Sequence, residues 1–249
     1  MRKWVAVVPA MGLLAGYGVL HRLGRTYGST ARERSAELPG DELLADPDLV
    51  CTHAITIGVG AERIWPWLVQ MGWHRGGWYT ARWVDRLLFP ANRPSSEEIV
   101  PELQHLQVGD FIPDGPPETQ CGFLVQQLQP PAHLVLRSNS HLPVSWRGHA
   151  QLDWTWAFVL VLLDGGRATR FLFRWRARTA PIWFRAFGWA LIVPADFIMS
   201  RDMMNGIKSR AEAKNPSLPP TRSQHAPAEV TKDPATQGLQ TPSGHPVSS

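Results

Sequence analysis

The sequence predicts an α+β domain in which an antiparallel sheet packs against a long C-terminal helix. From about residue 50 onward, the chain shows a strand, two short helices, several strands and a long amphipathic helix, in that order. Two neighbouring strands form a hairpin in which apolar and charged residues alternate. With 249 residues, 44% of them hydrophobic, the chain is long enough for one well-buried domain and further segments.

A membrane anchor is predicted at the N-terminus. Trp4 to Leu20 is an uncharged apolar run of 17 residues. This is close to the length that spans a hydrocarbon core of about 30 Å at about 1.5 Å rise per residue. A cleaved signal peptide is the alternative, although the nearest small-residue cleavage site, at Ser29 to Ala31, follows several charged residues.

The charges that flank this run predict its orientation. Four arginines follow it and two basic residues precede it, which favours a cytoplasmic domain by the positive-inside rule, with export as the alternative. Gly12 and Gly16 form a GxxxG pattern that allows two such helices to pair in a dimer. The flanking residues are Arg2 and Lys3 before the run, and Arg22, Arg25, Arg32 and Arg34 after it.

Composition divides the chain into four parts. Residues 1–25 form the anchor, 26–49 a polar linker, 50–214 the folded domain, and the proline-rich residues 215–249 a disordered tail. The net charge of +4 resides in the anchor, and the rest of the chain is neutral. We therefore expect no nucleic-acid partner, because the domain carries no basic footprint for a phosphate backbone.

A tryptophan-rich stretch from His53 to Asp85 forms the apolar centre of the predicted domain. Residues 53–57 alternate at period 2 and predict a half-buried strand. Ala61 to Met71 predicts a short helix, and Thr80 is placed to cap a second helix over residues 81–89. The tryptophans of this stretch are Trp65, Trp67, Trp73, Trp78 and Trp83.

The next segments predict a helix and two strands. The polar run 95–98 is typical of a helix start, so we expect one or two helical turns over residues 99–106. Residues 121–129 and 133–138 predict successive antiparallel strands joined by Pro130-Pro131.

The clearest hairpin lies between Leu152 and Arg178, with a turn at residues 164–167. If Gly165 and Gly166 are the loop residues, one face is aromatic and the other is charged and exposed to water. On the aromatic face Trp156 opposes Trp175, Phe158 opposes Phe173 and Leu160 opposes Phe171; on the charged face Asp153 opposes Arg178, Thr155 opposes Arg176 and Ala157 opposes Arg174.

Two helical segments follow the hairpin. Ile182 to Val193 is rich in aromatic residues and has one charge, so it either lies at a membrane interface or packs over the open end of the sheet. Residues 195–213 predict a long amphipathic helix, because Met199 and Met203 lie on one face and the charged residues on another.

Three motifs resemble a known superfamily. LPGDELL at residues 38–44, IWPWLVQMGWHRGGWYT at residues 64–80 and VGDFIP at residues 108–113 are similar to bacterial proteins of the START-like superfamily, also called SRPBCC or polyketide cyclase/dehydrase-like. The resemblance covers roughly residues 35–214. It implies a helix-grip fold, in which a curved antiparallel sheet wraps around the C-terminal helix and encloses an apolar cavity.

The resemblance also implies where a ligand would lie. Apolar walls with few polar groups suit a lipid or another hydrophobic small molecule. His74, Arg75 and Asp85 are the charged cluster inside the aromatic stretch, and they could orient a polar head group or act as acid and base. The alternative is a structural ion pair at a helix junction. The residues expected to line the cavity or its mouth are Trp78, Tyr79, Trp83, Trp156, Phe158, Phe173, Trp175, Met199 and Met203.

Three functions of different classes remain open. The first is a membrane-anchored binding module for a hydrophobic molecule, and the second is a cyclase or dehydratase on the same fold. The third is an interaction protein whose core its own tryptophans fill. No nucleophile, phosphate-loop or metal-ligand motif is present, so we expect no cofactor, no metal and no assignable catalytic residue. Cys51 and Cys121 suit small buried residues better than a disulfide.

Overall fold

The computed structural model describes residues 4–88 and 93–213. Within these ranges the side chains of residues 4–11, 13, 85, 87 and 88 are excepted. The tail expected to be disordered, 215–249, lies outside the described residues.

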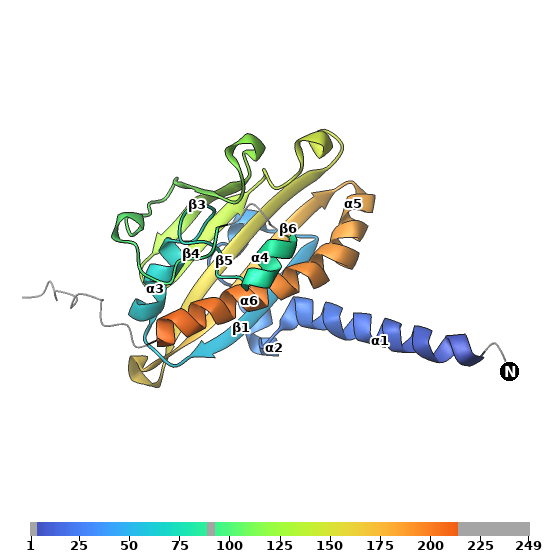
Figure 1. Ribbon diagram of the computed structural model, residues 1–249, viewed down its shortest axis with the longest axis horizontal. Helices are drawn as coiled ribbons and strands as arrows, with labels where there is room; N and C mark the ends of the chain where they lie inside the picture. The colour runs from blue at the N-terminus through green and yellow to red at the C-terminus, as the bar shows by residue number, and fades with distance from the viewer. Residues whose placement is uncertain (1–3, 89–92, 214–249) are drawn as a thin grey trace, which may run out of the picture. The chain divides into compact units, whose positions relative to one another are not determined.

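The described chain is an α+β fold with a six-stranded antiparallel sheet, as the sequence predicts (Figure 1). The strand order is β1-β6-β5-β4-β3-β2. The first strand, β1, therefore lies at one edge and pairs with the last strand, β6. The strands are β1 Leu49–Ile57, β2 Phe111–Pro113, β3 Gly122–Gln129, β4 His133–Ser138, β5 Gln151–Leu163 and β6 Ala168–Ala180.

Six α-helices accompany the sheet in the described ranges. The long C-terminal helix α6 lies across one face of the sheet and contacts α1, α3 and β1 (Figure 1). A π-helical turn, Gly188–Ile192, joins it to α5. The helices are α1 Trp4–Thr26, α2 Ala31–Ser35, α3 Ala61–Val69, α4 Arg82–Leu88, α5 Ile182–Phe187 and α6 Val193–Glu212.

The β5–β6 hairpin has the predicted register. Trp156 pairs with Trp175 and Asp153 with Arg178, and the turn occupies Asp164–Gly166. Gly165 and Gly166 take positive φ values of 66° and 88°, which glycine adopts without the steric cost of a side chain. Local turn chemistry and the alternation of the strands therefore suffice to fix this pairing.

The middle of the charged face of the hairpin is not exposed to water, contrary to the sequence prediction, whereas Arg178 at its end is exposed. Arg174 is only 3% exposed. Its guanidinium donates to the Asp41 carboxylate at 2.5 Å and to the carbonyl oxygens of Glu33 and Ala36 at 2.8 and 2.9 Å. The residues expected to form a linker, 26–49, thus cover this face, because they supply the acceptors that a buried guanidinium requires.

This covering segment has local order of its own. Thr30 and Glu33 form a capping box at the start of α2, which satisfies two helix N–H groups reciprocally. The Glu33 carboxylate also accepts from Arg170 at 2.7 Å, and this hydrogen bond lowers the pKa of Glu33 to about 2. The segment therefore belongs to the domain.

The second half of α1 packs against the sheet edge. The His53 imidazole donates to the Gly24 carbonyl oxygen at 2.7 Å, and the Ala54 N–H donates to the Tyr27 carbonyl oxygen at 2.9 Å. A Cβ at Gly24 would lie 2.7 Å from the Val193 carbonyl oxygen, so only glycine permits this approach. The predicted anchor thus continues directly into the folded domain.

Two predicted helices differ in the structure. Residues 99–106 form only a short 3-10 turn at Pro101–Leu103, because the Val100 N–H is bonded to the side chain of Gln70 instead of to a helical carbonyl. Pro194 does not end the preceding helix. It lies in the first turn of α6, where proline needs no N–H partner.

Within the described residues, one helical stretch is long and apolar enough to cross a membrane, by length and composition only. This stretch is Ile182–Glu212. In the most apolar 18 residues of this stretch, 33% of the residues are buried within the fold. This stretch contains α6, which packs on the sheet. The side chains of the predicted span at Trp4 to Leu20 are largely outside those described.

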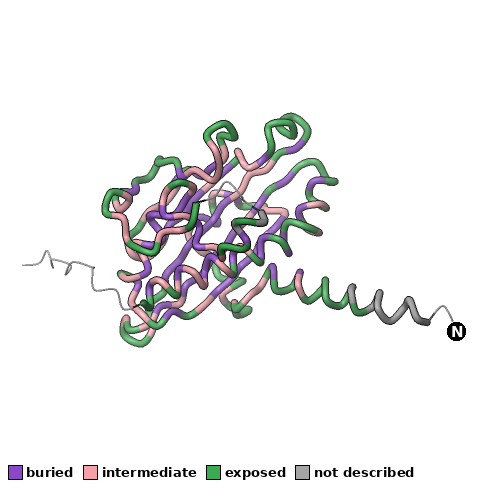
Figure 2. The backbone as a smooth tube through the Cα atoms, viewed as in Figure 1, coloured by how far each residue is buried: buried purple, intermediate pink, exposed green. Residues whose placement is uncertain are grey.

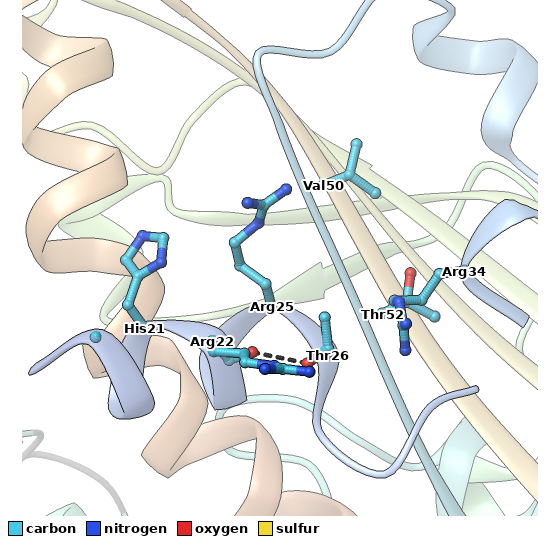
Figure 3. A pocket seen from close by; sticks show the side chains of 8 residues that line it. His21, Arg22, Arg25, Thr26, Arg34, Val50 and Thr52 are labelled. Atoms are coloured by element: carbon cyan, nitrogen blue, oxygen red, sulfur yellow. Dashed lines mark hydrogen bonds between the residues drawn. The ribbon is translucent and has the colours of Figure 1, made fainter. Parts of the chain in front are cut away.

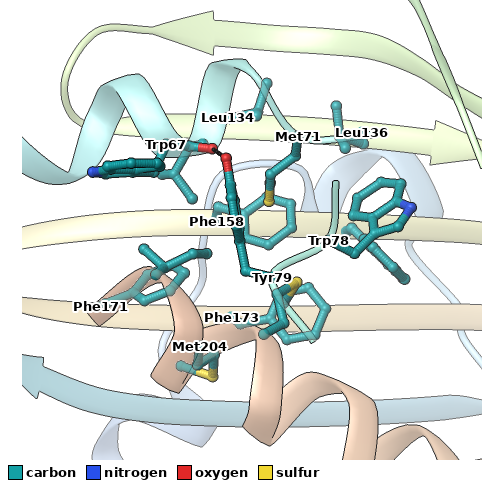
Figure 4. Packing of buried hydrophobic residues seen from close by; sticks show 14 of the residues in the cluster. Trp67, Met71, Trp78, Tyr79, Leu134, Leu136, Phe158, Phe171, Phe173 and Met204 are labelled. Carbon is teal, nitrogen blue, oxygen red and sulfur yellow. Dashed lines mark hydrogen bonds between the residues drawn. The ribbon is translucent and has the colours of Figure 1, made fainter. Parts of the chain in front are cut away.

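The main hydrophobic core lies between the sheet and α3 and α6. Buried positions follow the strands and the facing side of α6 (Figure 2). The core side chains include Phe158, Phe171 and Phe173, each 0% exposed (Figure 4). A smaller apolar cluster on the opposite face, around Val135 and Leu172, lies under the segment that covers Arg174.

Candidate functional site

The structure brings most of the predicted cavity residues together in the core, on the sheet face toward α6. Phe158 and Phe173 are stacked with ring centroids 4.9 Å apart (Figure 4). Met203 approaches from α6 and is 3% exposed, whereas Met199 is half-buried. The phenylalanine part of this wall is therefore filled by its own side chains.

Tyr79 and Trp83, both predicted near the mouth, lie in different environments. Tyr79 is 2% exposed, and its hydroxyl donates to the Trp67 carbonyl oxygen at 2.9 Å. Burial raises the pKa of that hydroxyl. Trp83, on α4, is 58% exposed. Tyr79 is thus a packed residue, and Trp83 faces away from the core.

Trp175 has a complete set of partners. Its indole N–H donates to Asp196 Oδ2 at 2.7 Å, and the Ser200 hydroxyl donates to the same oxygen at 2.8 Å. Asp196 enters the core from the first turn of α6 and is 7% exposed. Burial raises the pKa of Asp196 to about 6, and the two hydrogen bonds oppose that rise.

Four tryptophans have buried indole N–H groups without such partners among the described residues. Trp73 is stacked on His74, and we call the other three the indole cluster: Trp78, Trp154 and Trp156. The ring centroids of Trp156 lie 5.5 Å from those of Trp78 and 5.1 Å from those of Trp154. Phe123 completes the aromatic surface at 4.4 Å from Trp156. All three indole nitrogens are buried, and none has an acceptor among the described residues.

A histidine that sequence reasoning left unassigned borders the indole cluster. His141 lies in the loop after β4, with its ring 4.4 Å from Phe123 and 5.3 Å from Trp154. Its Nε2 is 2.9 Å from Asp114 Oδ2, and its Nδ1 is 2.6 Å from the Ser138 hydroxyl. This arrangement orients the imidazole and places a proton donor or acceptor beside the aromatic rings.

Cys121 extends this polar group. The ligand atoms of Asp114, Cys121 and His141 all lie within 4.8 Å of one another, so these three residues could hold a metal ion. Burial, and then the charge of Asp114, raises the pKa of the Cys121 thiol to about 12. The sequence predicts no metal site because the three residues form no ligand motif: Asp114 and Cys121 lie at the two ends of the β2–β3 loop, and His141 lies in the loop after β4. Strand pairing brings these two loops together at one end of the sheet.

Two of the three predicted polar residues, His74 and Arg75, line a small cavity that we call the mouth pocket. It measures about 230 Å³ and lies between residues 73–78 and 93–100. His74 has a positive φ of 57° and stacks on Trp73 with centroids 3.5 Å apart. Trp78 lines the pocket and also belongs to the indole cluster.

Arg75 has a structural role in this region. Its guanidinium donates to the carbonyl oxygens of Met71 and Val69, each at 2.9 Å. Burial lowers its pKa. The side chain of Asp85, the third predicted polar residue, lies outside those described. The structure therefore places His74 and Trp78 at the pocket and assigns Arg75 to holding the loop.

Comparison with known proteins finds the likeness in structure alone. No protein-family model matches the chain, and no curated protein matches it in sequence. A protein of Mesorhizobium loti is 13% identical, with a TM-score of 0.40, over 67% of this chain and 99% of its own. A hypothetical protein of Helicobacter pylori is 11% identical, with a TM-score of 0.42, over 71% and 96%.

The Aha1 dimer of Colwellia psychrerythraea is a further similar structure. It is 18% identical, with a TM-score of 0.33, over 62% of this chain and 93% of its own. The fold of this chain is best described by its own topology, a six-stranded antiparallel sheet with a long C-terminal helix across one face.

Proposed function

We propose that this protein is a membrane-anchored binding protein for a small, largely apolar molecule that carries hydrogen-bond acceptors. The observation that carries the proposal is the indole cluster, in which Trp78, Trp154 and Trp156 have buried N–H groups without an acceptor among the described residues. The START-like resemblance implies ligand binding on the same face of the sheet.

The energetics of the indole cluster support this proposal. A buried donor left without a partner costs about 1 to 3 kcal/mol, and native proteins contain few such groups. Three of them around one aromatic surface favour an acceptor supplied from outside the chain. Trp175 differs from these three residues, because its indole N–H donates a hydrogen bond to Asp196 at 2.7 Å.

The chemistry of the surroundings defines the class of ligand. Phe123 and the indole rings offer flat apolar surfaces, which favour a ring system or another rigid hydrophobic body. The indole N–H groups favour carbonyl, ether or hydroxyl oxygens on that body. His141, whose two ring nitrogens are bonded to Asp114 and Ser138, adds a further ring at the edge of this surface.

A surface beside α1 supports membrane anchoring. The Tyr17 hydroxyl donates to the Ala190 carbonyl oxygen at 2.6 Å, and the ring of His21 lies 4.1 Å from that of Trp189. The end of the apolar run thus lies next to the segment that the sequence suggests for the membrane interface. That segment exposes large apolar side chains, as expected for contact with a headgroup layer: Ile182, Trp183, Trp189, Leu191 and Ile192, which are 38 to 71% exposed.

The proposed orientation and pairing follow from α1. The arginines after the apolar run favour a single-pass protein with a cytoplasmic domain, and export remains the alternative. Gly12 and Gly16 have no atom within 4 Å of an added Cβ, so their face of α1 is open for pairing with a second copy.

Small molecules extracted from the purified full-length protein test the binding proposal. Trp156→Phe keeps the aromatic packing and removes one unpartnered N–H. We expect the wild type to retain a compound and this variant to bind it about fivefold more weakly, the equivalent of one hydrogen bond of about 1 kcal/mol. Trp183→Phe, on the exposed surface, is the matched control. Equal retention by both variants contradicts the site, and a wild type without any compound favours the interaction protein with a filled core.

A second candidate function, an enzyme of the cyclase or dehydratase type, is favoured by the His141–Asp114 pair. Its imidazole is bonded to the Asp114 carboxylate on one nitrogen and to the Ser138 hydroxyl on the other, so a proton can pass to or from a bound molecule through that hydroxyl. His141→Gln distinguishes the two functions. An enzyme should accumulate a precursor that differs from the compound in the wild type, by one water in mass for a dehydration or in chromatographic retention for a ring closure that loses no atoms. A binding protein should hold the same compound.

A further inference from the structure

A basic cavity lies where α1 meets the edge of the sheet (Figure 3). It measures about 450 Å³ and is lined by α1, by Arg34 of α2 and by Val50 and Thr52 of β1. We call it the α1 pocket. Its cationic side chains are Arg22, Arg25 and Arg34, with His21 beside them, and no acidic residue lines it.

The positive charge of the α1 pocket is not neutralised by the described residues. The guanidinium groups of Arg22 and Arg25 make no hydrogen bond or ion pair within the part of the chain that the structure describes. Glu33 is engaged with Arg170, and Asp41 with Arg174 and Arg176.

The shape of the pocket allows a ligand to approach the helix. A Cβ added at Gly18 would meet no atom within 4 Å, so the α1 backbone is open there. The side chain of Arg25 extends along β1 toward Val50, whereas Arg22 lies beside Thr26 (Figure 3). Two guanidinium groups thus border one space from different directions, which suits an anion with several acceptor oxygens.

The position of the pocket along α1 places its arginines at the depth of the phosphate groups of a lipid bilayer. The apolar run ends at Leu20, and a helix rises about 1.5 Å per residue. Arg22 and Arg25 therefore lie about 3 and 8 Å beyond the hydrocarbon boundary. The headgroup layer on each side of a bilayer is roughly 5 to 8 Å thick, so both residues reach the depth of lipid phosphates.

We infer that the α1 pocket binds a phosphate group, from either an anionic phospholipid or a soluble phosphate compound. Binding of a lipid headgroup rests on the membrane anchoring proposed above. Binding of soluble phosphate does not, because it needs only the folded domain and the second half of α1. The pocket is separate from the indole cluster, so its ligand need not be the molecule bound there.

Two experiments on the full-length protein test the inference. In the lipid experiment, the protein is reconstituted in nanodiscs of phosphatidylcholine and phosphatidylglycerol, and the lipids retained after release are identified by native mass spectrometry. In the phosphate experiment, inorganic phosphate is added to detergent-solubilised protein, and the change in Tm is measured against chloride at equal ionic strength. Arg25→Gln is the test variant, and Arg32→Gln, an exposed residue outside the pocket, is the matched control.

We expect Arg25→Gln to weaken binding of the anionic group at least about tenfold, because a hydrogen bond to a charged group is lost. Arg32→Gln should bind like the wild type. Retained phosphatidylglycerol that is lost only in Arg25→Gln supports a lipid ligand, and a Tm rise that is lost only in that variant supports a soluble one. The inference is overturned if the two substitutions have equal effects in both experiments, or if neither substitution changes binding in either experiment.

A separate measurement tells failure of the proposed membrane anchoring from failure of the phosphate site in the α1 pocket. If the full-length protein does not float with vesicles after an alkaline wash, the proposed membrane anchoring is wrong. The phosphate experiment then decides on the pocket alone: a Tm rise that Arg25→Gln abolishes supports it, and no rise overturns it.

Discussion

At the scale of single residues, Asp196 shows how burial changes the chemistry of a carboxyl group. Its oxygen accepts from Trp175 and Ser200, yet burial still raises its pKa from 3.8 to about 6. The folded protein therefore holds this proton more tightly than the unfolded chain. As the pH rises from about 4 to 6, the unfolded state loses the proton first, and stability from this group is lost.

Asp196→Asn should remove that pH dependence. The amide keeps an oxygen for Trp175 and does not ionise. We expect the free energy of unfolding of the variant, relative to the wild type, to rise by about 2 kcal/mol between pH 4 and pH 7, since each pKa unit corresponds to about 1.4 kcal/mol and the unfolded carboxyl is already partly ionised at pH 4. Chemical denaturation at the two pH values measures it. A difference that stays constant with pH would show that Asp196 titrates normally in the folded protein.

At the scale of elements, the outer face of the β5–β6 hairpin depends on a buried ion pair. Arg174 and Asp41 have side chains that are 3% and 10% exposed, and Arg176 adds a second contact to Asp41 at 2.9 Å. Arg174 also donates to carbonyl oxygens of the covering segment. The ion pair thus attaches residues 26–49 to the sheet.

Asp41→Asn should loosen this segment. Removing one partner of a buried ion pair leaves the other charge uncompensated, which costs about 3 to 5 kcal/mol. We expect lower stability and faster hydrogen exchange over α2 and residues 41–44. Asp46→Asn is the control, because Asp46 is 97% exposed and lies 4.0 Å from Arg178. Unchanged exchange in Asp41→Asn would show that the segment is held by its apolar contacts instead.

At the scale of the whole molecule, α1 belongs to both the proposed anchor and the domain. The carbonyl oxygen of Gly24, in its second half, accepts a hydrogen bond from β1. The carbonyl oxygen of Tyr27, just after the helix, accepts another. His21 is 7% exposed beside Trp189. A fragment that begins at residue 21 therefore keeps these contacts, and one that begins at residue 29 loses them.

The two fragments should differ in stability and in membrane affinity. Residues 29–213 should be less stable than residues 21–213 by at least about 2 kcal/mol, because two hydrogen bonds and their apolar surroundings are lost. Residues 21–213 should retain affinity for anionic vesicles through the exposed side chains around Trp189, with a blue shift of tryptophan emission. If this fragment stays in the supernatant at low salt and its emission does not shift, the interfacial contact is ruled out.

Local patterns in the sequence determined the sheet and its clearest register. The pairing of Trp156 with Trp175 follows from period-2 alternation and from two glycines at the turn, and both are properties of neighbouring residues. The amphipathic pattern likewise predicts α6. These features can be derived from the sequence because the interactions that fix them are short in range.

Only the tertiary structure decided which polar residues meet. Arg174 is buried because carbonyl oxygens more than 130 positions earlier surround it. Asp114, Cys121 and His141 converge because strand pairing brings the β2–β3 loop and the loop after β4 to one end of the sheet. The three indole N–H groups lack acceptors because of packing that no periodicity encodes. Local sequence sets which face of an element is apolar, whereas the partners of a buried polar group are set by where distant segments come together.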